Sequence, residues 1–149
     1  MAFVHWENKF SISNDWIDAE HRMLFLLCRK LDYALKNDLS EILLRSILLE
    51  IKTFTEFHFL SEENLMQEIG YPGIGEHSSL HRRLLFGLEE MTGDIVRHKT
   101  SEFSMLEFLH SWLLNHIEHV DMKLGAYARS APARPVGEKF YRHFLKPRG

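Results

Sequence analysis

Apolar residues recur at intervals of three and four along four long segments of the chain. This spacing places them on one face of an α-helix, whereas the alternation typical of strands is scarce. The clearest stripe is formed by Leu24, Leu27, Leu31 and Leu35. The pattern therefore predicts an all-α protein.

Capping and helix-breaking residues give the expected bounds of these helices. Ser40 is a plausible N-cap, Gly70 and Pro72 end the segment that follows it, and Pro132 stops the last helix. The helices are predicted over residues 18–36, 41–69, 76–97 and 102–128.

Short connections between four amphipathic helices favour an antiparallel up-down-up-down four-helix bundle. About seventeen residues precede the first helix, and we expect them to cross the bundle as an ordered N-terminal arm that contains Trp6 and Trp16. The predicted domain is residues 1–128, followed by a C-terminal extension, 129–149, with a short helix near 138–145.

Charge is distributed unevenly between these two parts. The extension has six Lys or Arg residues against Glu138 alone, a net charge of +5, so residues 1–128 carry −8. An acidic body argues against nucleic acid as a partner. The basic extension, with Phe140 and Phe144, is expected to dock on the bundle or to contact a protein partner or membrane surface.

The sequence gives no sign of export or membrane insertion. It contains no apolar run near eighteen residues and no basic segment followed by an apolar one at the N-terminus. We therefore expect a cytoplasmic protein with no transmembrane segment. The single cysteine, Cys28, lies in the apolar run MLFLLC and is expected to be a buried core thiol.

Ten histidines are several times the usual number for 149 residues, and many share a helix face with a second metal-ligand residue. The pairs His58 and Glu62, and His77 and His81, are four apart. In a folded bundle, the rise per residue places four groups at the same height along the bundle axis: both pairs, His21 and the heptapeptide NHIEHVD (115–121). One such pair is usually solvated, but four helices contributing at one height indicate a metal site.

Spacing alone does not identify which residues of NHIEHVD are metal ligands. His116 and His119 are three apart and slightly favoured as a pair, whereas His116 and Asp121 are five apart, about 140° around an ideal helix. The metal is equally open, because a histidine-rich set suits iron, copper or zinc. The segment HSSLH lacks the glutamate of the zinc-protease motif His-Glu-x-x-His.

The motifs HFLSE (58–62), HSSLH (77–81) and WLLNHIEHVD (112–121), together with His21, resemble the ligand motifs of single-domain bacterial hemerythrins. The resemblance extends over about residues 4–128. It implies a di-iron centre with a bridging oxygen, held by His21, His58, Glu62, His77, His81, His116 and Asp121. By the same resemblance Glu62 and Asp121 bridge the irons, one of which has three histidines and the other two.

The resemblance further implies that the protein binds dioxygen reversibly, for storage, delivery or scavenging, and is not an enzyme. The alternative is a sensor of oxygen, nitric oxide or redox state. Apolar positions of the family's oxygen pocket match Leu24, Phe59, Trp112, Leu113 and Ile117.

Two further expectations concern residues beside these motifs. Family members often have a tyrosine at the position of Leu124, so the surroundings of the centre are expected to differ there. The remaining histidines are not expected to be ligands; they are His5, His98, His110, His119 and His143.

Overall fold

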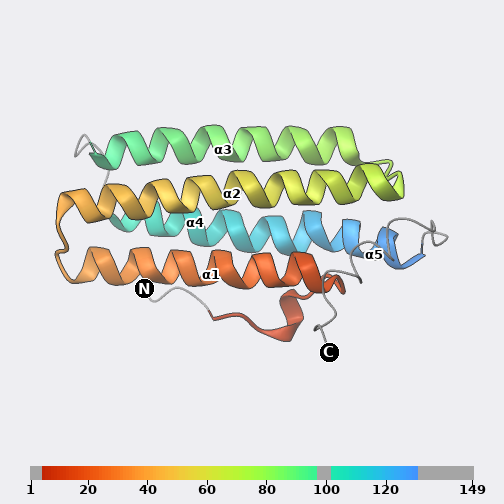
Figure 1. Ribbon diagram of the computed structural model, residues 1–149, viewed down its shortest axis with the longest axis horizontal. Helices are drawn as coiled ribbons and strands as arrows, with labels where there is room; N and C mark the ends of the chain where they lie inside the picture. Colours follow the sequence, from red (N-terminus) through yellow and green to blue (C-terminus); the bar gives the residue numbers. More distant parts are fainter. Residues whose placement is uncertain (1–4, 97–101, 131–149) are drawn as a thin grey trace, which may run out of the picture.

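Four long antiparallel helices lie side by side in the computed structural model, which describes residues 5–96 and 102–130 (Figure 1). The helices are α1 (Asp15–Lys36), α2 (Glu41–Ile69), α3 (Ile74–Val96) and α4 (Glu102–His116), and α4 continues through η2 (Ile117–Asp121) into α5 (Met122–Ser130). Helix α1 packs against α2 and α4, and α3 packs against the same two helices. The all-α four-helix bundle expected from the sequence is confirmed.

Helix α1 begins at Asp15, three residues before the predicted start. Its N-cap is Asn14, whose side chain accepts a hydrogen bond from the backbone N–H of Ile17 at 3.0 Å. Asp18, the start predicted from the sequence, has another partner: its carboxylate accepts from the backbone N–H of Ile12 at 2.9 Å and from the hydroxyl of Ser11. The N-terminal arm therefore uses the carboxylate that could have capped the helix.

The predicted ends of α2 are both observed. Ser40 accepts a hydrogen bond from the backbone N–H of Leu43, and Gly70 ends the helix in the left-handed conformation, with φ of 66°. Helix α3 begins at Ile74, two residues before the expected start, because the turn after Gly70 leads directly into it.

The last helix, predicted over residues 102–128, is observed, but it contains a turn of a different helix type that the sequence did not predict. Residues Ile117–Asp121 form a π-helical turn, η2, between α4 and α5. Helix α5 is described as far as Ser130, so the helical stretch covers the predicted range to residue 128. The predicted cap at residues 100–101 and the extension from residue 131 onward lie outside the described residues.

The core runs along the inside of the bundle and is built from the stripes that the sequence displays. Leu24, Leu31 and Leu35 of α1 are buried against residues of α2 and α4, such as Leu48 and Leu109. Cys28 is also buried in this cluster, as expected, and burial raises the pKa of its thiol to about 12. A reactive role for this thiol is therefore disfavoured.

The N-terminal arm closes the end of the bundle that carries the histidines. It contains a short 3₁₀ helix, η1 (Asn8–Phe10), and Phe10 and Ile12 are buried against the helices. At Ile12 the arm approaches Gly125 of α5 so closely that a β-carbon there would lie 2.4 Å from the carbonyl oxygen of Ile12. Arg129 donates to the hydroxyl of Ser13 at 2.9 Å, which fastens the arm to α5.

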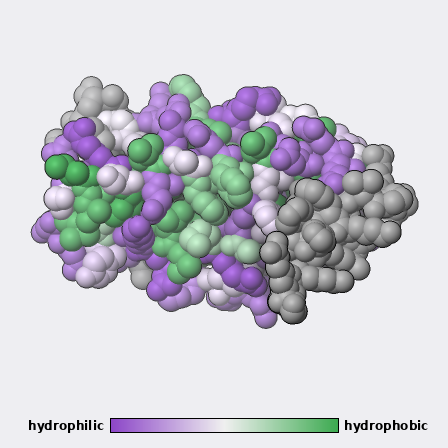
Figure 2. Space-filling model, in the orientation of Figure 1, coloured by the Kyte–Doolittle hydropathy of each residue, from purple (hydrophilic) through white to green (hydrophobic). Residues whose placement is uncertain are grey.

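On the face shown in Figure 2, hydrophilic residues lie along the upper and lower edges, and hydrophobic residues gather at the left end and across the middle. Exposed examples on α1 and α2 are Leu26, Leu49 and Leu60. Among the described helices, none combines the length and hydrophobicity needed to cross a membrane.

Candidate metal centre

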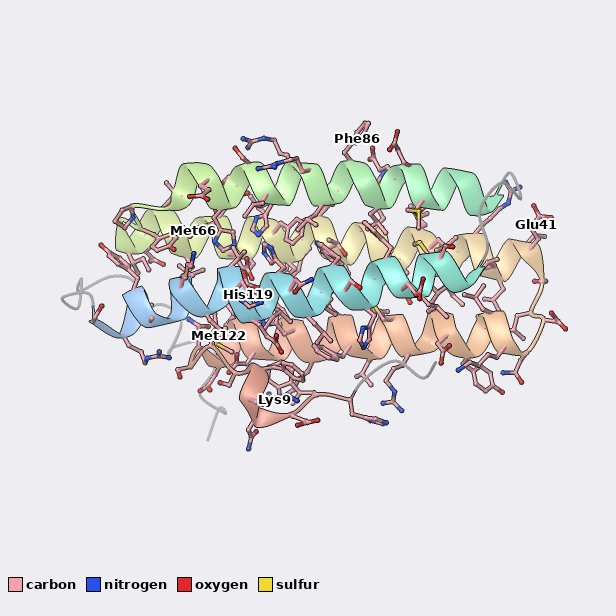
Figure 3. All side chains as sticks on the ribbon, turned by 180° about the vertical axis from the view of Figure 1, so that it is seen from behind. Lys9, Glu41, Met66, Phe86, His119 and Met122 are labelled. Atoms are coloured by element: carbon pink, nitrogen blue, oxygen red, sulfur yellow. The ribbon has the colours of Figure 1, made fainter. Side chains whose placement is uncertain are left out.

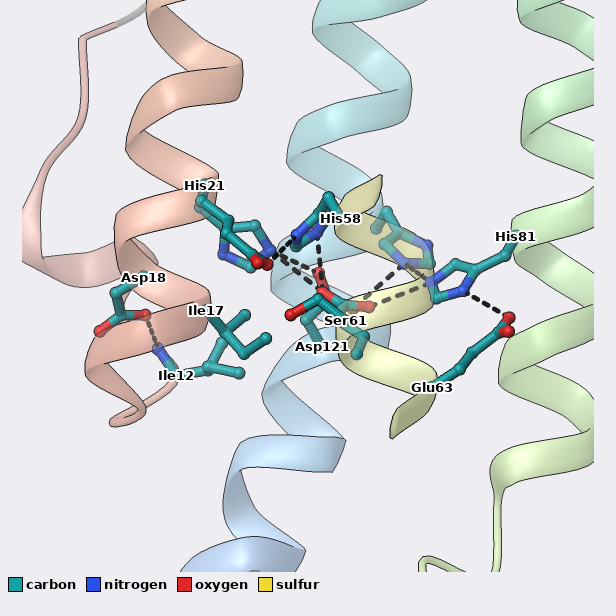
Figure 4. A network of polar contacts seen from close by, with 12 residues as sticks. Ile12, Ile17, Asp18, His21, His58, Ser61, Glu63, His81 and Asp121 are labelled. Carbon is teal, nitrogen blue, oxygen red and sulfur yellow. Dashed lines mark hydrogen bonds and ion pairs between the residues drawn. The ribbon is translucent and has the colours of Figure 1, made fainter. Parts of the chain in front are cut away.

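Side chains from all four long helices and η2 meet inside the bundle at the level predicted from the sequence (Figure 4). They form two groups whose ligand atoms lie within 4.8 Å of one another. The first group contains Glu62, His77, His81, His116 and Asp121, and the second contains His21, His58, Glu62 and Asp121. The structure thus brings together all seven predicted ligands, and Glu62 and Asp121 belong to both groups.

Each shared carboxylate presents one oxygen to each group. Oε1 of Glu62 lies 3.3 Å from Nε2 of His21 and 2.9 Å from Nε2 of His58. Oδ2 of Asp121 also faces the second group, at 3.1 Å from Nε2 of His21.

The other two carboxylate oxygens face the three-histidine group. Oε2 of Glu62 lies 3.2 Å from Nε2 of His77 and 3.0 Å from Nε2 of His81. Oδ1 of Asp121 lies 3.1 Å from Nε2 of His77 and 3.1 Å from Nε2 of His116. Glu62 and Asp121 therefore stand between the groups as two bridging ligands would.

These separations fit a metal centre better than a network of hydrogen bonds. Ligand atoms about 2.1 Å from a metal ion and at right angles to one another are separated by about 3 Å. Nε2 of His77, Oε2 of Glu62 and both carboxylate oxygens of Asp121 are buried and have no hydrogen-bond partner in the described part of the chain. Buried polar atoms left in this way are costly, and coordination would satisfy them.

The contact between His81 and His116 supports the same conclusion. Their Nε2 atoms face each other at 3.1 Å, and Nδ1 of His81 is already within hydrogen-bond distance of Glu63. If Nδ1 of His81 carries its proton, Nε2 has only a lone pair to offer. Two imidazole nitrogens that converge on one point are typical of ligands of a shared cation.

The π-helical turn explains how His116 and Asp121 join one group despite their separation of five residues. A π-turn holds more residues than the 3.6 of an α-helical turn and often occurs at functional sites. Because of η2, the side chains of His116 and Asp121 both point into the bundle and are buried. Glu118 and His119, which lie between them, are exposed to solvent. Figure 3 shows His119 on the outward side of this segment.

The charges within the cluster stabilise one another in the metal-free protein. Burial by itself would lower the pKa of His58, but the charge of Glu62 and hydrogen bonds to Glu20 and Glu62 raise that pKa to about 10. The pKa of His77 is raised to about 9, because Asp121 and Glu62 outweigh its burial. Conversely, burial would raise the pKa values of Glu62 and Asp121, yet the neighbouring histidines hold both well below the usual range. A cation in the centre would replace these protons.

Apolar side chains enclose the cluster. All five residues expected to line a pocket are buried in the same core cluster: Leu24, Phe59, Trp112, Leu113 and Ile117. The ring of Phe59 stacks on that of His81, with centroids 3.8 Å apart and planes inclined by 3°, and it meets Trp112 edge-on. The packing keeps the His81 ring in one orientation and surrounds the centre with hydrocarbon.

Two carboxylates that sequence reasoning missed also contact the histidines. Glu20 lies 2.9 Å from Nδ1 of His58, and Glu63 lies 3.1 Å from Nδ1 of His81. The only signal in the sequence is that each adjoins a predicted ligand, Glu20 before His21 and Glu63 after Glu62.

Other sequence expectations near the centre have distinct outcomes. His5 and His119 are exposed and lie outside both groups, as does His110, whereas His98 and His143 fall outside the described residues. Leu124 is fully buried with Ile12, Ile17, Leu65 and Met66. The position three residues after Asp121, where family members often have a tyrosine, therefore lies in an apolar cluster.

Tyrosines do lie near this end of the centre, but they come from other positions. The ring of Tyr71 meets that of His77 edge-on at 6.4 Å and that of Tyr127 at 5.3 Å. The hydroxyl of Tyr127 donates to the carbonyl of Gly70 at 3.3 Å.

Comparison with known proteins agrees with this geometry. Bacteriohemerythrin from Clostridium acetobutylicum is 30% identical over 121 residues, which cover 78% of this chain and 94% of that protein. Myohemerythrin from Riftia pachyptila is 25% identical over 123 residues, which cover 79% of this chain and 88% of that protein. A crystal structure of wild-type hemerythrin superposes with a TM-score of 0.73 at 25% identity, covering 84% of this chain and 97% of that one. Residues 13–128 match the model of the hemerythrin HHE cation binding domain, so the chain belongs to the hemerythrin family.

Proposed function

We propose that this protein holds two iron ions in the buried centre and binds dioxygen reversibly, for storage, delivery or scavenging. One observation carries the proposal. Glu62 and Asp121 each direct one carboxylate oxygen to the first group and the other oxygen to the second group, as ligands that bridge two ions would. A centre for a single ion would not need two separate sets of histidines around shared carboxylates.

The unequal number of histidines indicates where dioxygen would bind. Among the residues that the structure describes, three imidazoles serve one group, but only His21 and His58 serve the other. With equal contributions from Glu62 and Asp121, an iron ion in the second group has fewer positions filled by the protein. We therefore assign dioxygen binding to that side, where the iron pair, when bound, would supply the electrons that reversible uptake requires.

The protein's own contribution is to keep the whole centre dry. Ile117 and Leu24 are at most 1% exposed, and Phe59, Leu113 and Trp112 are at most 8% exposed. Such apolar surroundings exclude the water and protons that would promote irreversible oxidation of the centre. This supports binding and release of dioxygen over its consumption.

The decisive experiment is to load the protein with iron under anaerobic reducing conditions, admit air and record the visible spectrum. We expect metal analysis to give two irons per chain and an oxygen-dependent absorption band that disappears under vacuum and returns on aeration. A band that decays within seconds and does not recover would contradict reversible carriage and favour a sensor. No band together with a single bound zinc would overturn the iron assignment.

A further inference from the structure

One histidine in each group has a carboxylate on the ring nitrogen that faces away from the cluster. Nδ1 of His58 lies 2.9 Å from Oε2 of Glu20. Nδ1 of His81 lies 3.1 Å from Oε1 of Glu63 (Figure 4). In contrast, Nδ1 of His21 and Nδ1 of His77 are buried and have no hydrogen-bond partner among the described residues. Carboxylates therefore support His58 and His81 but not His21 or His77.

These contacts decide which nitrogen of each ring can bind a metal. An ionised carboxylate only accepts hydrogen bonds, so in their neutral, metal-binding form His58 and His81 donate from Nδ1 and keep a lone pair on Nε2. In both residues Nε2 is the atom that faces Glu62. A carboxylate in this place also makes the imidazole a stronger base and thus a stronger ligand for an oxidised metal ion.

The two carboxylates differ in their surroundings. Glu20 is buried, with its side chain only 8% exposed, and its Oε1 accepts a hydrogen bond from Nε1 of Trp16 at 2.8 Å. The same indole N–H lies 3.1 Å from the hydroxyl of Ser61, on the next helix. The side chain of Glu63 is 26% exposed. Because charge acts more strongly where water is excluded, Glu20 should affect its histidine more than Glu63 does.

We propose that Glu20 is a positioning residue, held in place by Trp16, that acts through His58 to set the reduction potential and metal affinity of the two-histidine side. Glu63 does the same, more weakly, for His81 on the other side. The inference rests on the proposed function, since it requires iron in the centre. It assigns to the pair Trp16 and Glu20 control over the ion at which dioxygen would bind.

The test compares Glu20→Gln with wild type in the iron-loaded, full-length protein. Glutamine can still accept a hydrogen bond from Nδ1 of His58, so the substitution removes the charge while largely keeping the shape. We expect iron to be bound about 10-fold more weakly. We also expect a higher reduction potential, about 59 mV for each tenfold change in the ratio of ferric to ferrous affinity.

Two matched variants separate this role from a structural one. Glu63→Gln should shift the potential in the same direction by less than Glu20→Gln. Asp32→Asn removes another buried carboxylate of α1, one that pairs with Lys36 and lies three turns from His21, and should leave the potential unchanged. Thermal melting of each metal-free variant reports any loss of fold stability separately.

Trp16→Phe provides an independent test if Glu20→Gln does not fold. It leaves both carboxylates in place and removes the indole N–H that donates to Glu20 and also lies against Ser61. Because Glu20 is then held less firmly beside His58, we expect a smaller rise in potential.

The outcomes distinguish the two proposals. Suppose that the wild-type protein binds two irons but that the reduction potential of Glu20→Gln equals that of wild type. The positioning role is then wrong, and the proposed function stands. If Glu20→Gln is unfolded, the potential of Trp16→Phe decides in the same way. An equal shift in Asp32→Asn would also overturn the positioning role. A wild-type chain that binds no iron overturns the proposed function and, with it, this inference.

Discussion

His116 and Asp121 are five residues apart, yet Nε2 of the histidine lies 3.1 Å from Oδ1 of the aspartate inside the bundle. On a continuous α-helix the two side chains would diverge by about 140°. The π-helical turn from Ile117 to Asp121 removes this divergence, and it leaves Glu118 and His119 in solvent. A local change in helix type thus selects which polar residues of the segment reach the centre.

The first prediction follows from this selection. His116→Ala removes a ring nitrogen that converges with those of His77 and His81, and we expect iron to fall well below two per chain. His119→Ala removes an exposed imidazole three residues away and should leave the iron content near two. Metal analysis of the purified, iron-loaded variants checks both. The opposite result would mean that His119 is the ligand.

A second prediction concerns the contact between the arm and α5. In Gly125→Ala the new methyl group would lie 2.4 Å from the carbonyl oxygen of Ile12, so the arm must move. We expect a loss of about 1–3 kcal/mol in the free energy of unfolding, the usual cost of overpacking. Gly75→Ala in α3 is the matched control, because a β-carbon there meets nothing within 4 Å, and it should be neutral or slightly stabilising. Urea unfolding of the metal-free variants measures the difference, and equal stability of the two would refute the close packing.

The carboxylate of Asp18 gives a third prediction. Asp18→Ala leaves the backbone N–H of Ile12 and the hydroxyl of Ser11 without their acceptor, at a cost of about 1–3 kcal/mol in the free energy of unfolding. Asp15→Ala, at an exposed position of the same helical turn, should cost less. Limited proteolysis should also cut the arm faster in Asp18→Ala than in Asp15→Ala. Unchanged proteolysis would show that other contacts hold the arm.

The fourth prediction is the pH dependence of the metal-free protein. His58 and His77 have pKa values of about 10 and about 9 in the folded state, against an ordinary value near 6.5 in the unfolded chain. Groups whose pKa is raised by folding contribute stability that is fully present below the unfolded value and is lost as pH rises through the folded value. Stability should therefore fall between about pH 6.5 and 10.

Urea unfolding of the metal-free protein at intervals across this range measures the slope. Glu62→Gln removes a carboxylate that raises the pKa of both histidines, so its profile should be flatter. A wild-type stability that is constant or rises over this range would show that the cluster does not hold these protons.

Some sequence expectations failed because contacts between distant segments decided the outcome. Asn14 and Asp18 both suit an N-cap, and only the folded arm, which binds the carboxylate of Asp18, leaves the cap to Asn14. Likewise, no periodicity in the chain distinguishes Glu20 from other acidic residues of α1. Its role depends on His58, which comes from the next helix and reaches it only in the bundle.

What the sequence determined by itself was the set of helices, their antiparallel order and the level at which the histidine and carboxylate motifs meet. These features depend on helical periodicity and rise per residue, which are local properties of the chain. The tertiary structure alone decided the π-helical turn before Met122, the division of the oxygens of Glu62 and Asp121 between two groups, and the carboxylates behind two histidines. The last two of these depend on atoms of different helices lying within about 3 Å of one another, a separation that no pattern within one helix specifies. The spacing of apolar residues likewise does not distinguish a π-helical turn from the α-helical turns beside it.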